Sequence, residues 1–280
     1  MRTALLALAG AAALAAQQYR AFWADAFHPG AKTPAQIEQL VDDLTTAKAN
    51  AVIAQMRPRG NWLYPHPVEP FYSDSQYAPG FDALQYLIER AHARGIEVHA
   101  WANVTSVGTS TDPRHLTAAH GPAAEEEEMW MTVSSAGRIS PSSIDLGHPG
   151  ALRHTADVIL DAARYGLDGI HMDYVRYPED ADYGWNPVAV ERFQRLWNRA
   201  GKPDPRDPAW AEFRRTQVTQ FVRQLYLRAF AIRPSIRISA ASVTWGSGPA
   251  DDAGYRRLDA YSRVFQDWRG WLEEGILDFA

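Results

Sequence analysis

The stretch that decides the fold reads LDGIHMDYVRYP, at residues 167–178. Successive side chains of a β-strand point to opposite faces of its sheet. Gly169, His171 and Asp173 therefore share one face, while the residues between them give the other face an apolar surface. The pattern predicts a buried strand covered by helices on its apolar side, with a carboxylate at its carboxyl end. In a barrel of parallel strands, that end carries the catalytic groups.

Strand-like and helix-like segments alternate along the rest of the chain. Further strands are expected at residues 19–25, 50–57, 96–103, 236–243 and 275–279. Helix starts are marked by Thr33 and Asp82 as caps, and by Pro149, Pro187 and Pro208 as first helical residues. A last helix is expected at residues 262–273. This alternation predicts parallel strands joined by right-handed crossovers.

The predicted fold class is α/β, as a (β/α)8 barrel of the TIM type. No GxGxxG or GxxxxGK[ST] motif follows a predicted strand, so neither nucleotide-binding α/β fold is favoured. The barrel is expected to be incomplete, because about six of its eight strands are found. The sequence ends inside the sixth of them, which predicts a C-terminally truncated barrel domain over residues 16–280. Within a long insertion at residues 104–147, the segment from 129 to 139 has the pattern of a hairpin.

The N-terminus differs from the rest of the chain. Arg2 precedes an apolar run at residues 4–16 that contains a small-x-small site at 13–15. This pattern predicts a secretory signal peptide over residues 1–15, a mature chain that starts near Ala16 or Gln17, and a secreted or periplasmic location. The run is too short for a mature membrane span. A buried first helix is the alternative.

The overall composition narrows the classes of function. The 280 residues carry a formal net charge of -5 with no long basic run, which argues against nucleic acid as the main partner. The chain has no cysteine, so a disulfide framework is excluded. The sequence does not predict an oligomeric state.

Strand alternation also predicts which side chains face the barrel interior, and these are unusually polar. Beside Asp173, the inward candidates for substrate contact are Asp25, Gln55, Arg57, His99, Trp101, Asn103 and His171. Buried polar groups are costly unless they are paired, so one end of the barrel is expected to hold a hydrated site. Among the aromatic residues of the strand ends and loops, Trp62, Trp101, Tyr174 and Trp185 are favoured as ligand-stacking residues. The alternative is that they pack the loops onto the barrel.

A pair of carboxylates is the usual requirement for cleaving a glycosidic bond. Asp173 is the candidate for the first, and Arg176 beside it is expected to bind substrate and to keep Asp173 ionised. The alternative role for Asp173 is a structural salt bridge to Arg57 or Arg176. The second carboxylate stays open among Asp25, Glu69, Asp74, Asp180 and Asp182, with a position beyond residue 280 as the alternative. Asp278 is expected to be structural.

Other chemistries have less support in the sequence. There is no HExxH motif and no HxH at a strand end, so no metal or other cofactor is predicted. His99 and His171 are expected to be hydrogen-bonded core residues or substrate contacts. No GxSxG elbow is present, which leaves a serine hydrolase unsupported.

Several motifs together are similar to those of the glycosyl-hydrolase-like family 10, a bacterial group of exported proteins distinct from the family 10 xylanases. They are RAFWAD at 20–25, FHPG at 27–30, QMR at 55–57, HAWAN at 99–103, DLGHP at 145–149 and DGIHMDYVRYP at 168–178. The resemblance covers nearly all of the chain after the predicted signal peptide, although the family domain runs further than this chain does.

The resemblance implies a TIM-type barrel that hydrolyses O-glycosidic bonds, and some relatives act on peptidoglycan glycan strands that lack stem peptides. The family's acidic position at the end of strand four maps onto Asp173. The implied partner is a polysaccharide or peptidoglycan glycan. A non-catalytic carbohydrate-binding barrel is the alternative, and a metal-dependent hydrolase is a weaker third hypothesis.

Overall fold

The computed structural model describes residues 18–78 and 80–280. The predicted signal peptide and the predicted start of the mature chain lie outside these residues. Over the described part of the chain, none of the helices has the length and apolar character needed to cross a membrane.

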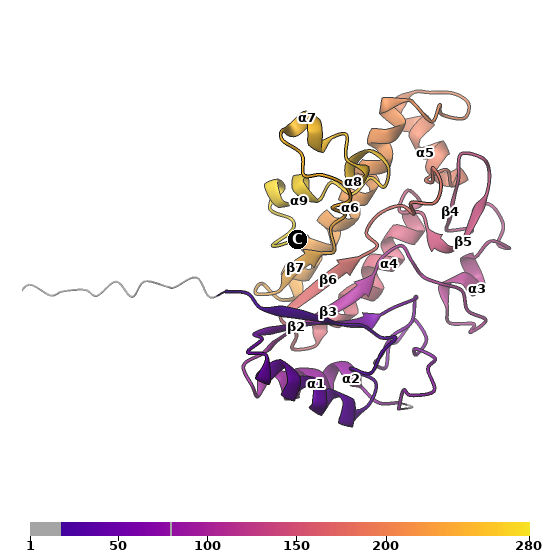
Figure 1. Cartoon of the computed structure of the whole chain (residues 1–280). Helices are drawn as coiled ribbons and strands as arrows, with labels where there is room; N and C mark the ends of the chain where they lie inside the picture. Colours follow the sequence, from indigo (N-terminus) through magenta and orange to yellow (C-terminus); the bar gives the residue numbers. More distant parts are fainter. Residues whose placement is uncertain (1–17, 79) are drawn as a thin grey trace, which may run out of the picture.

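A parallel sheet of five strands forms the centre of the molecule (Figure 1). Its order is β1 (Ala21–Ala24), β2 (Ala51–Arg57), β3 (Glu97–Asn103), β6 (Gly169–Asp173) and β7 (Arg237–Ala240). All neighbouring pairs run parallel, as the alternation of strands and helices predicted. In the register of β3 and β6, Trp101 lies beside His171 and Asn103 lies beside Asp173.

The prediction of a sixth strand at residues 275–279 is wrong, because the described part of the chain forms no strand there. Phe279 forms only an isolated parallel bridge to Ser239, and the N–H of Asp278 donates to the carbonyl of Ile238 at 2.8 Å. The described sheet is therefore open, with β1 and β7 at its edges, rather than a closed barrel.

The sheet is nevertheless strongly curved. A flat sheet would hold β1 and β6 about 14 Å apart, because two strands lie between them. The rings of Trp23 on β1 and His171 on β6 are only 5.8 Å apart. Near the amino ends of the strands, the hydroxyl of Tyr19 lies 2.7 Å from Nε2 of His99, and its ring is 5.2 Å from that of Phe279. The inward side chains therefore converge on one concave face.

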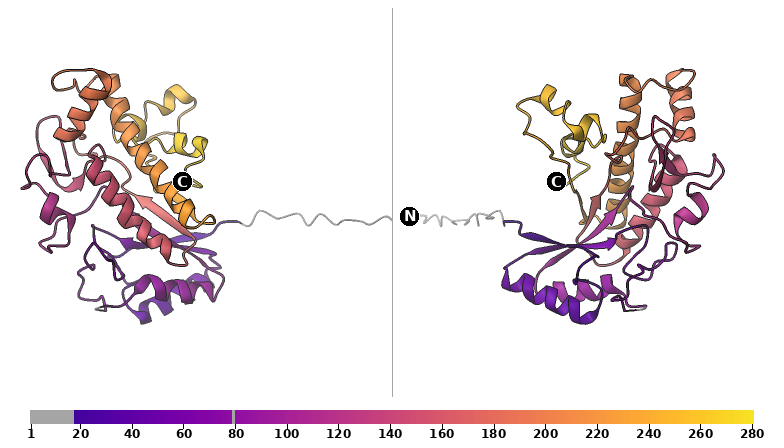
Figure 2. Two further views of the ribbon diagram at one scale, coloured as in Figure 1. Left: turned by 180° about the vertical axis from the view of Figure 1, so that it is seen from behind. Right: turned by 45° about the vertical axis from the view of Figure 1, so that its right-hand side comes forward.

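Helices cover the convex face of the sheet, as the apolar strand face predicted. Figures 1 and 2 show α1 (Pro34–Thr46) and α2 (Ala83–His92) over one part of the sheet, with α4 (Pro149–Asp161) and α6 (Pro208–Ile232) over the rest. The strand residues that face these helices are buried: Val52, Ala54, Met56, Val98, Ala100, Ala102, Ile170 and Met172. The predicted caps are confirmed, since Thr33 accepts the N–H of Gln36 and Asp82 accepts that of Gln85.

The remaining elements lie between and after these layers. They are α3 (Leu116–His120), the antiparallel hairpin of β4 (Met131–Val133) and β5 (Ile139–Ile144), the short helix η1 (Ala162–Arg164), α5 (Pro187–Trp197), α7 (Asp252–Tyr255), α8 (Asp259–Ser262) and α9 (Trp268–Glu274). The predicted hairpin is confirmed, whereas the helix predicted at residues 262–273 is interrupted between α8 and α9.

Gly169 opens β6 because a side chain at this position has no room. An added Cβ would lie 2.1 Å from Nδ1 of His99 and 2.8 Å from the carbonyl oxygen of Arg237. We expect Gly169→Ala to lower the free energy of unfolding by about 1–3 kcal/mol in urea denaturation, as overpacking does elsewhere. Gly166→Ala is the matched control, because its Cβ would meet nothing closer than 3.8 Å. Equal effects of the two variants would contradict this explanation.

Candidate functional site

Asp173 lies at the carboxyl end of β6 and has no ion pair among the described residues. Its Oδ1 accepts the N–H of Tyr174 at 2.7 Å. The two arginines considered as partners bind other carboxylates: Arg57 pairs with Glu69, and Arg176 pairs with Glu179. The alternative of a structural salt bridge at Asp173 is therefore wrong.

Burial raises the pKa of the Asp173 carboxyl above its usual value. The N–H of Tyr174, the charge of Arg176 and the indole of Trp101 oppose this effect without cancelling it. Arg176 favours the ionised form of Asp173, as expected from the sequence, but burial outweighs its charge, so the pKa is raised overall. A carboxyl group that keeps its proton to higher pH is suited to act as a general acid.

Three other predicted site residues gather beside Asp173. The indole of Trp101 donates to Oδ1 of Asn103 at 3.1 Å, and the amide of Gln55 lies 3.4 Å from the same oxygen. Nδ2 of Asn103 donates to the carbonyl of Pro58 at 2.7 Å, which fixes the amide. These bonds join the ends of β2 and β3 next to Asp173 and form a polar cluster at the carboxyl edge of the sheet.

His171 lies one inward position before Asp173 and is buried. Its Nδ1 is 2.9 Å from Oγ of Ser239 on β7, and its ring lies 6.4 Å from that of Trp101. Burial and the nearby His99 lower the pKa of His171 to about 3. His171 is therefore a neutral hydrogen-bonding group beneath the candidate carboxyl.

The lowered pKa of His171 makes stability depend on pH. Below about pH 6.5 the unfolded chain takes up a proton at this residue, and the folded chain does so only near pH 3. We expect His171 to reduce the free energy of unfolding by up to about 1.4 kcal/mol per pH unit as the pH falls through this window. Urea denaturation at pH 7 and pH 5 should show a smaller loss in His171→Gln than in the wild type. Equal losses would refute the assignment.

His99 lies away from this cluster. The cluster lies at the carboxyl ends of the strands, whereas His99 is near the amino end of β3. It is paired in register with Gly169, the first residue of β6, and its Nε2 contacts the hydroxyl of Tyr19. His99 is wholly buried, and burial lowers its pKa. The structure therefore places His99 in the core, which was one of the two roles that the sequence left open.

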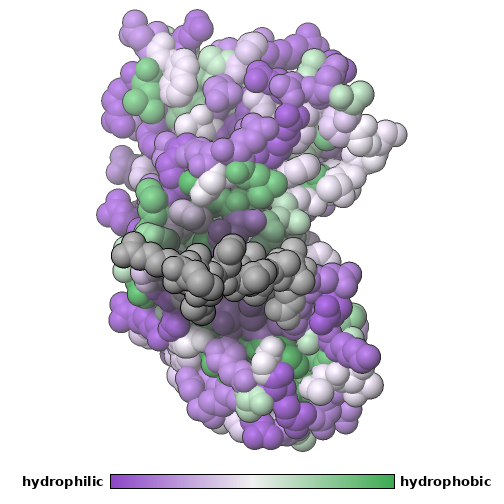
Figure 3. Space-filling view, turned by 90° about the vertical axis from the view of Figure 1, so that its left-hand side faces the viewer, coloured by the Kyte–Doolittle hydropathy of each residue, from purple (hydrophilic) through white to green (hydrophobic). Residues whose placement is uncertain are grey.

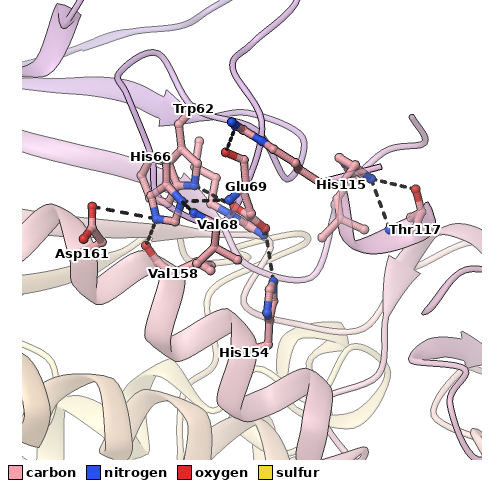
Figure 4. A network of polar contacts seen from close by, with 12 residues as sticks. Trp62, His66, Val68, Glu69, His115, Thr117, His154, Val158 and Asp161 are labelled. Carbon is pink, nitrogen blue, oxygen red and sulfur yellow. Dashed lines mark hydrogen bonds and ion pairs between the residues drawn. The ribbon is translucent and has the colours of Figure 1, made fainter. Parts of the chain in front are cut away.

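Arg57 and Trp62 are also buried, which corrects their prediction as substrate contacts. Nε of Arg57 and Nε1 of Trp62 both donate to Oε2 of Glu69 at 2.7 Å. His154 lies 3.6 Å from the other oxygen of Glu69, and His66 stacks on Trp62 (Figure 4). The Arg57 guanidinium, hydrogen-bonded to the buried Glu69 carboxylate, holds the pKa of that carboxyl well below its usual range. This network packs the loop after β2, so neither Arg57 nor Trp62 faces a ligand.

Trp185 is likewise part of a packed cluster rather than an open surface. Its ring lies 5.1 Å from that of Trp210, within a separate hydrophobic group on α5 and α6. Lys202 and Arg214 cover the ring, at 5.1 Å and 5.8 Å. The packing alternative for Trp185 therefore holds in this structure, whereas Tyr174 is exposed.

Most candidates for the second carboxylate are engaged elsewhere. Glu69 is in the buried network, Asp74 binds Lys32 at 2.7 Å, Asp180 binds Arg138 at 2.7 Å, and Asp182 binds Arg214 at 2.5 Å. Asp278 accepts the N–H of Ile238 near the amino end of β7, in a structural role.

Asp25 remains, directly after β1. Its carboxylate accepts the N–H groups of Phe27 and His28 and contacts the His28 ring at 2.9 Å. Burial raises its pKa, but these hydrogen bonds outweigh burial and lower the pKa overall. Asp25 and Asp173 are therefore shifted in opposite directions, although no contact joins them.

The sequence patterns did not point to Thr105, which organises the turn after Asp173. Its hydroxyl oxygen lies 2.6 Å from the carbonyl oxygen of Tyr174 and 2.7 Å from that of Arg176, and the two carbonyls share its single proton. These partners lie about seventy residues further along the chain, and no local motif signals such a contact.

The comparisons with known proteins agree with the motifs. The family model described as "Glycosyl hydrolase-like 10" matches residues 15–280. Glycosyl hydrolase DigH of Escherichia coli (strain K12) is 28% identical over 262 residues, covering 88% of this chain and 56% of DigH. Glycosyl hydrolase YngK of Bacillus subtilis (strain 168) is 27% identical over 261 residues, covering 86% and 47%. The chain thus spans about half the length of these curated relatives.

Solved structures of glycoside hydrolases resemble the fold. The PgaB (BpsB) glycoside hydrolase domain from Bordetella bronchiseptica has a TM-score of 0.57 at 18% identity, covering 79% of this chain and 64% of that one. An alpha-L-fucosidase from Paenibacillus thiaminolyticus has a TM-score of 0.57 at 17% identity, covering 80% and 32%. These likenesses concern the fold alone, and they relate the curved parallel sheet to the TIM-barrel glycoside hydrolases. By its match over residues 15–280, the chain belongs to the glycosyl hydrolase-like 10 family.

Proposed function

We propose that this chain is the catalytic part of an exported glycoside hydrolase that cleaves O-glycosidic bonds of a bacterial cell-wall or related polysaccharide. The observation that carries the proposal is Asp173 at the carboxyl edge of a parallel sheet, a carboxyl that has a raised pKa and forms no ion pair with the residues that the structure describes. Family membership supports the class of reaction. That DigH and YngK are named glycosyl hydrolases supports it further.

In this mechanism Asp173 donates its proton to the glycosidic oxygen as the bond to the sugar breaks. Asp25, whose pKa is lowered, is the described carboxylate best suited to act as base or nucleophile on the opposite side. The curvature that brings Trp23 within 5.8 Å of His171 turns β1 towards β6 and supports this pairing. Trp101 lies partly exposed at the same edge and would contact the sugar, while the buried Gln55 and Asn103 hold the indole in place.

We further propose that residues 16–280 form part of a (β/α)8 barrel. A cavity of about 560 Å³ lies between the two edge strands, lined by residues that include Phe22, Trp23, His171 and Phe279. Trp23 is 66% exposed there, and Figure 3 shows apolar side chains at the surface on this side of the molecule. Additional strands between β7 and β1 would cover these side chains and close the sheet.

The proposed activity is tested by incubating the protein, in its full-length form, with peptidoglycan strands freed of stem peptides and with chitin-type and glucan-type oligosaccharides. Mass spectrometry of the products identifies the bond that is cleaved. A non-catalytic carbohydrate-binding barrel is the second candidate, because no described contact brings another carboxylate to Asp173. It predicts saturable binding of a glycan without any product.

Export is tested separately. Removal of a signal peptide over residues 1–15 should give a secreted or periplasmic protein that starts near Ala16 or Gln17. N-terminal sequencing of the protein recovered from outside the cytoplasm measures this directly. Recovery of a chain that begins at Met1 would contradict the proposal.

A further inference from the structure

The turn that follows Asp173 is held in a strained conformation. Tyr174 has a φ of 48°, in the left-handed region that residues other than glycine seldom adopt. Thr105 fixes the turn, since its N–H and hydroxyl both donate to the Tyr174 carbonyl, at 3.1 Å and 2.6 Å. Such strain persists only where the surroundings hold it, and it concentrates at functional sites. The backbone thus presents the Tyr174 ring in one fixed orientation beside Asp173.

Arg176 lies between two exposed aromatic rings at this edge of the sheet. Its guanidinium carbon is 4.9 Å from the ring centre of Tyr174 and 5.4 Å from that of Trp245. The two rings are 39% and 42% exposed. Trp245 follows β7, the strand next to β6, so the ends of two neighbouring strands build the arrangement. We call Tyr174, Arg176 and Trp245 the arginine clamp.

Only part of the Arg176 guanidinium is used within the fold. Nη1 donates to Oε2 of Glu179 at 2.5 Å and lies 3.4 Å from the carbonyl of Tyr177. Across the described residues, no hydrogen bond engages Nε or Nη2. These two nitrogens form an edge of the planar guanidinium that can bind a carboxylate with two parallel hydrogen bonds. The Arg176 side chain is 10% exposed, and the two aromatic rings beside it restrict the guanidinium before a ligand arrives.

We propose that the arginine clamp binds a carboxylate carried by a sugar of the substrate, next to the glycosidic oxygen that Asp173 protonates. This inference rests on the proposed function and adds the residues that would select a sugar carrying a carboxylate. The aromatic faces would stack on the sugar ring while Nε and Nη2 bind its carboxylate. A singly charged carboxylate fits better than a phosphate group, because the carboxylate of Glu179 binds the same guanidinium and repels additional negative charge.

A change at Glu179 should strengthen the binding of an acidic glycan, whereas loss of Arg176 should weaken it. Burial raises the pKa of Glu179, but the hydrogen bond and the charge of Arg176 outweigh burial and lower it overall. Glu179 is therefore ionised near neutral pH and competes with an incoming anion for Arg176. Glu179→Gln removes this competing charge and keeps the shape of the side chain, so it should strengthen the binding of an acidic glycan.

The experiment measures binding without turnover, in the Asp173→Asn background of the full chain. The probes are peptidoglycan strands freed of stem peptides, whose lactyl groups carry carboxylates, and the same strands after reduction of those carboxylates to alcohols. Arg176→Met should weaken binding of the carboxylated strands about tenfold or more and leave binding of the reduced strands unchanged. Glu179→Gln should tighten binding of the carboxylated strands alone. Circular dichroism confirms that each variant is folded.

Arg138→Met is the matched control. Arg138 also packs on an aromatic ring, at 5.4 Å from Tyr183, and binds a carboxylate, that of Asp180, but it lies on the hairpin. Its replacement removes the same charge and should not change glycan binding. Equal losses in Arg138→Met and Arg176→Met would overturn the clamp, as would equal affinity of the parent protein for the two probes or a failure to bind either.

Turnover separates failure of the clamp from failure of the proposed function. Carboxylate-dependent binding that needs Arg176, without products from the protein that retains Asp173, would support the clamp and contradict the hydrolase. Cleavage of carboxylated and reduced strands with equal kcat/KM would support the hydrolase and contradict the clamp.

Discussion

Replacing Asp173 with asparagine should reduce the release of reducing ends from the glycan substrate by about 10²–10⁴-fold, the contribution usual for a general acid. Asparagine has nearly the same shape as aspartic acid but cannot donate an acidic proton. Because Asp173 has no ion pair among the described residues, the substitution breaks no salt bridge, and the free energy of unfolding should change little. Reducing-end assays and urea denaturation of the same preparations measure the two effects.

The pH profile adds a second readout for the same residue. Burial raises the pKa of Asp173, so the protonated form should persist to higher pH than in an exposed aspartic acid. Activity should therefore fall as the pH rises through this raised pKa. Arg176→Met removes a charge that lowers this pKa, and it should move the alkaline limb to still higher pH.

Two further variants make the test of Asp173 specific. Asp180→Asn changes an exposed aspartate that binds Arg138, and it should leave turnover unchanged. Asp25→Asn should also reduce turnover if Asp25 is the second carboxylate, with a change on the acid limb of the pH profile. Unchanged turnover in Asp173→Asn would remove Asp173 from the mechanism. A loss in that variant alone would leave the second carboxylate outside the candidates described here.

The second large effect is expected at Glu69, on stability rather than on activity. Glu69→Gln keeps the shape of the side chain but leaves Arg57 buried and without a counter-charge, since the Arg57 and Glu69 side chains are both wholly buried. Breaking a buried ion pair by removing one partner costs about 3–5 kcal/mol. Trp62 also donates to Glu69, so the loop after β2 should loosen (Figure 4). Denaturation in urea at neutral pH measures the loss.

A double variant controls for the size of this effect. Glu69→Leu combined with Arg57→Met removes both charges and fills the space with apolar atoms, so it should recover much of the stability lost in Glu69→Gln. The lowered pKa of Glu69 also predicts a pH window. Its contribution is present above about pH 4.5 and is lost as the pH falls below that value. A double variant less stable than Glu69→Gln would show that the ion pair itself is a net source of stability.

Much of the fold could be predicted because it follows from local patterns. Alternating polar and apolar residues located the five strands of the parallel sheet, and Thr33, Asp82 and the prolines located the helix starts. The same alternation placed Gln55, Trp101, Asn103 and Asp173 on one face, and strand pairing brought them together. These properties depend on residues a few positions apart, which a sequence displays directly.

The tertiary structure decided which polar side chains form ion pairs and which remain available for catalysis. Arg57 ends β2 and Asp173 ends β6, and strand alternation predicts that both face inward. In the structure Arg57 binds Glu69 from the following loop, whereas Asp173 forms no ion pair within the described part of the chain. Burial then raises the pKa of Asp173 despite Arg176, and it removes Trp62 and Trp185 from the surface. Pairing and desolvation depend on groups brought close by loops and sheet curvature. The sequence by itself therefore determined the strands and the edge at which the site lies, and only the folded chain determined the charge and exposure of each side chain there.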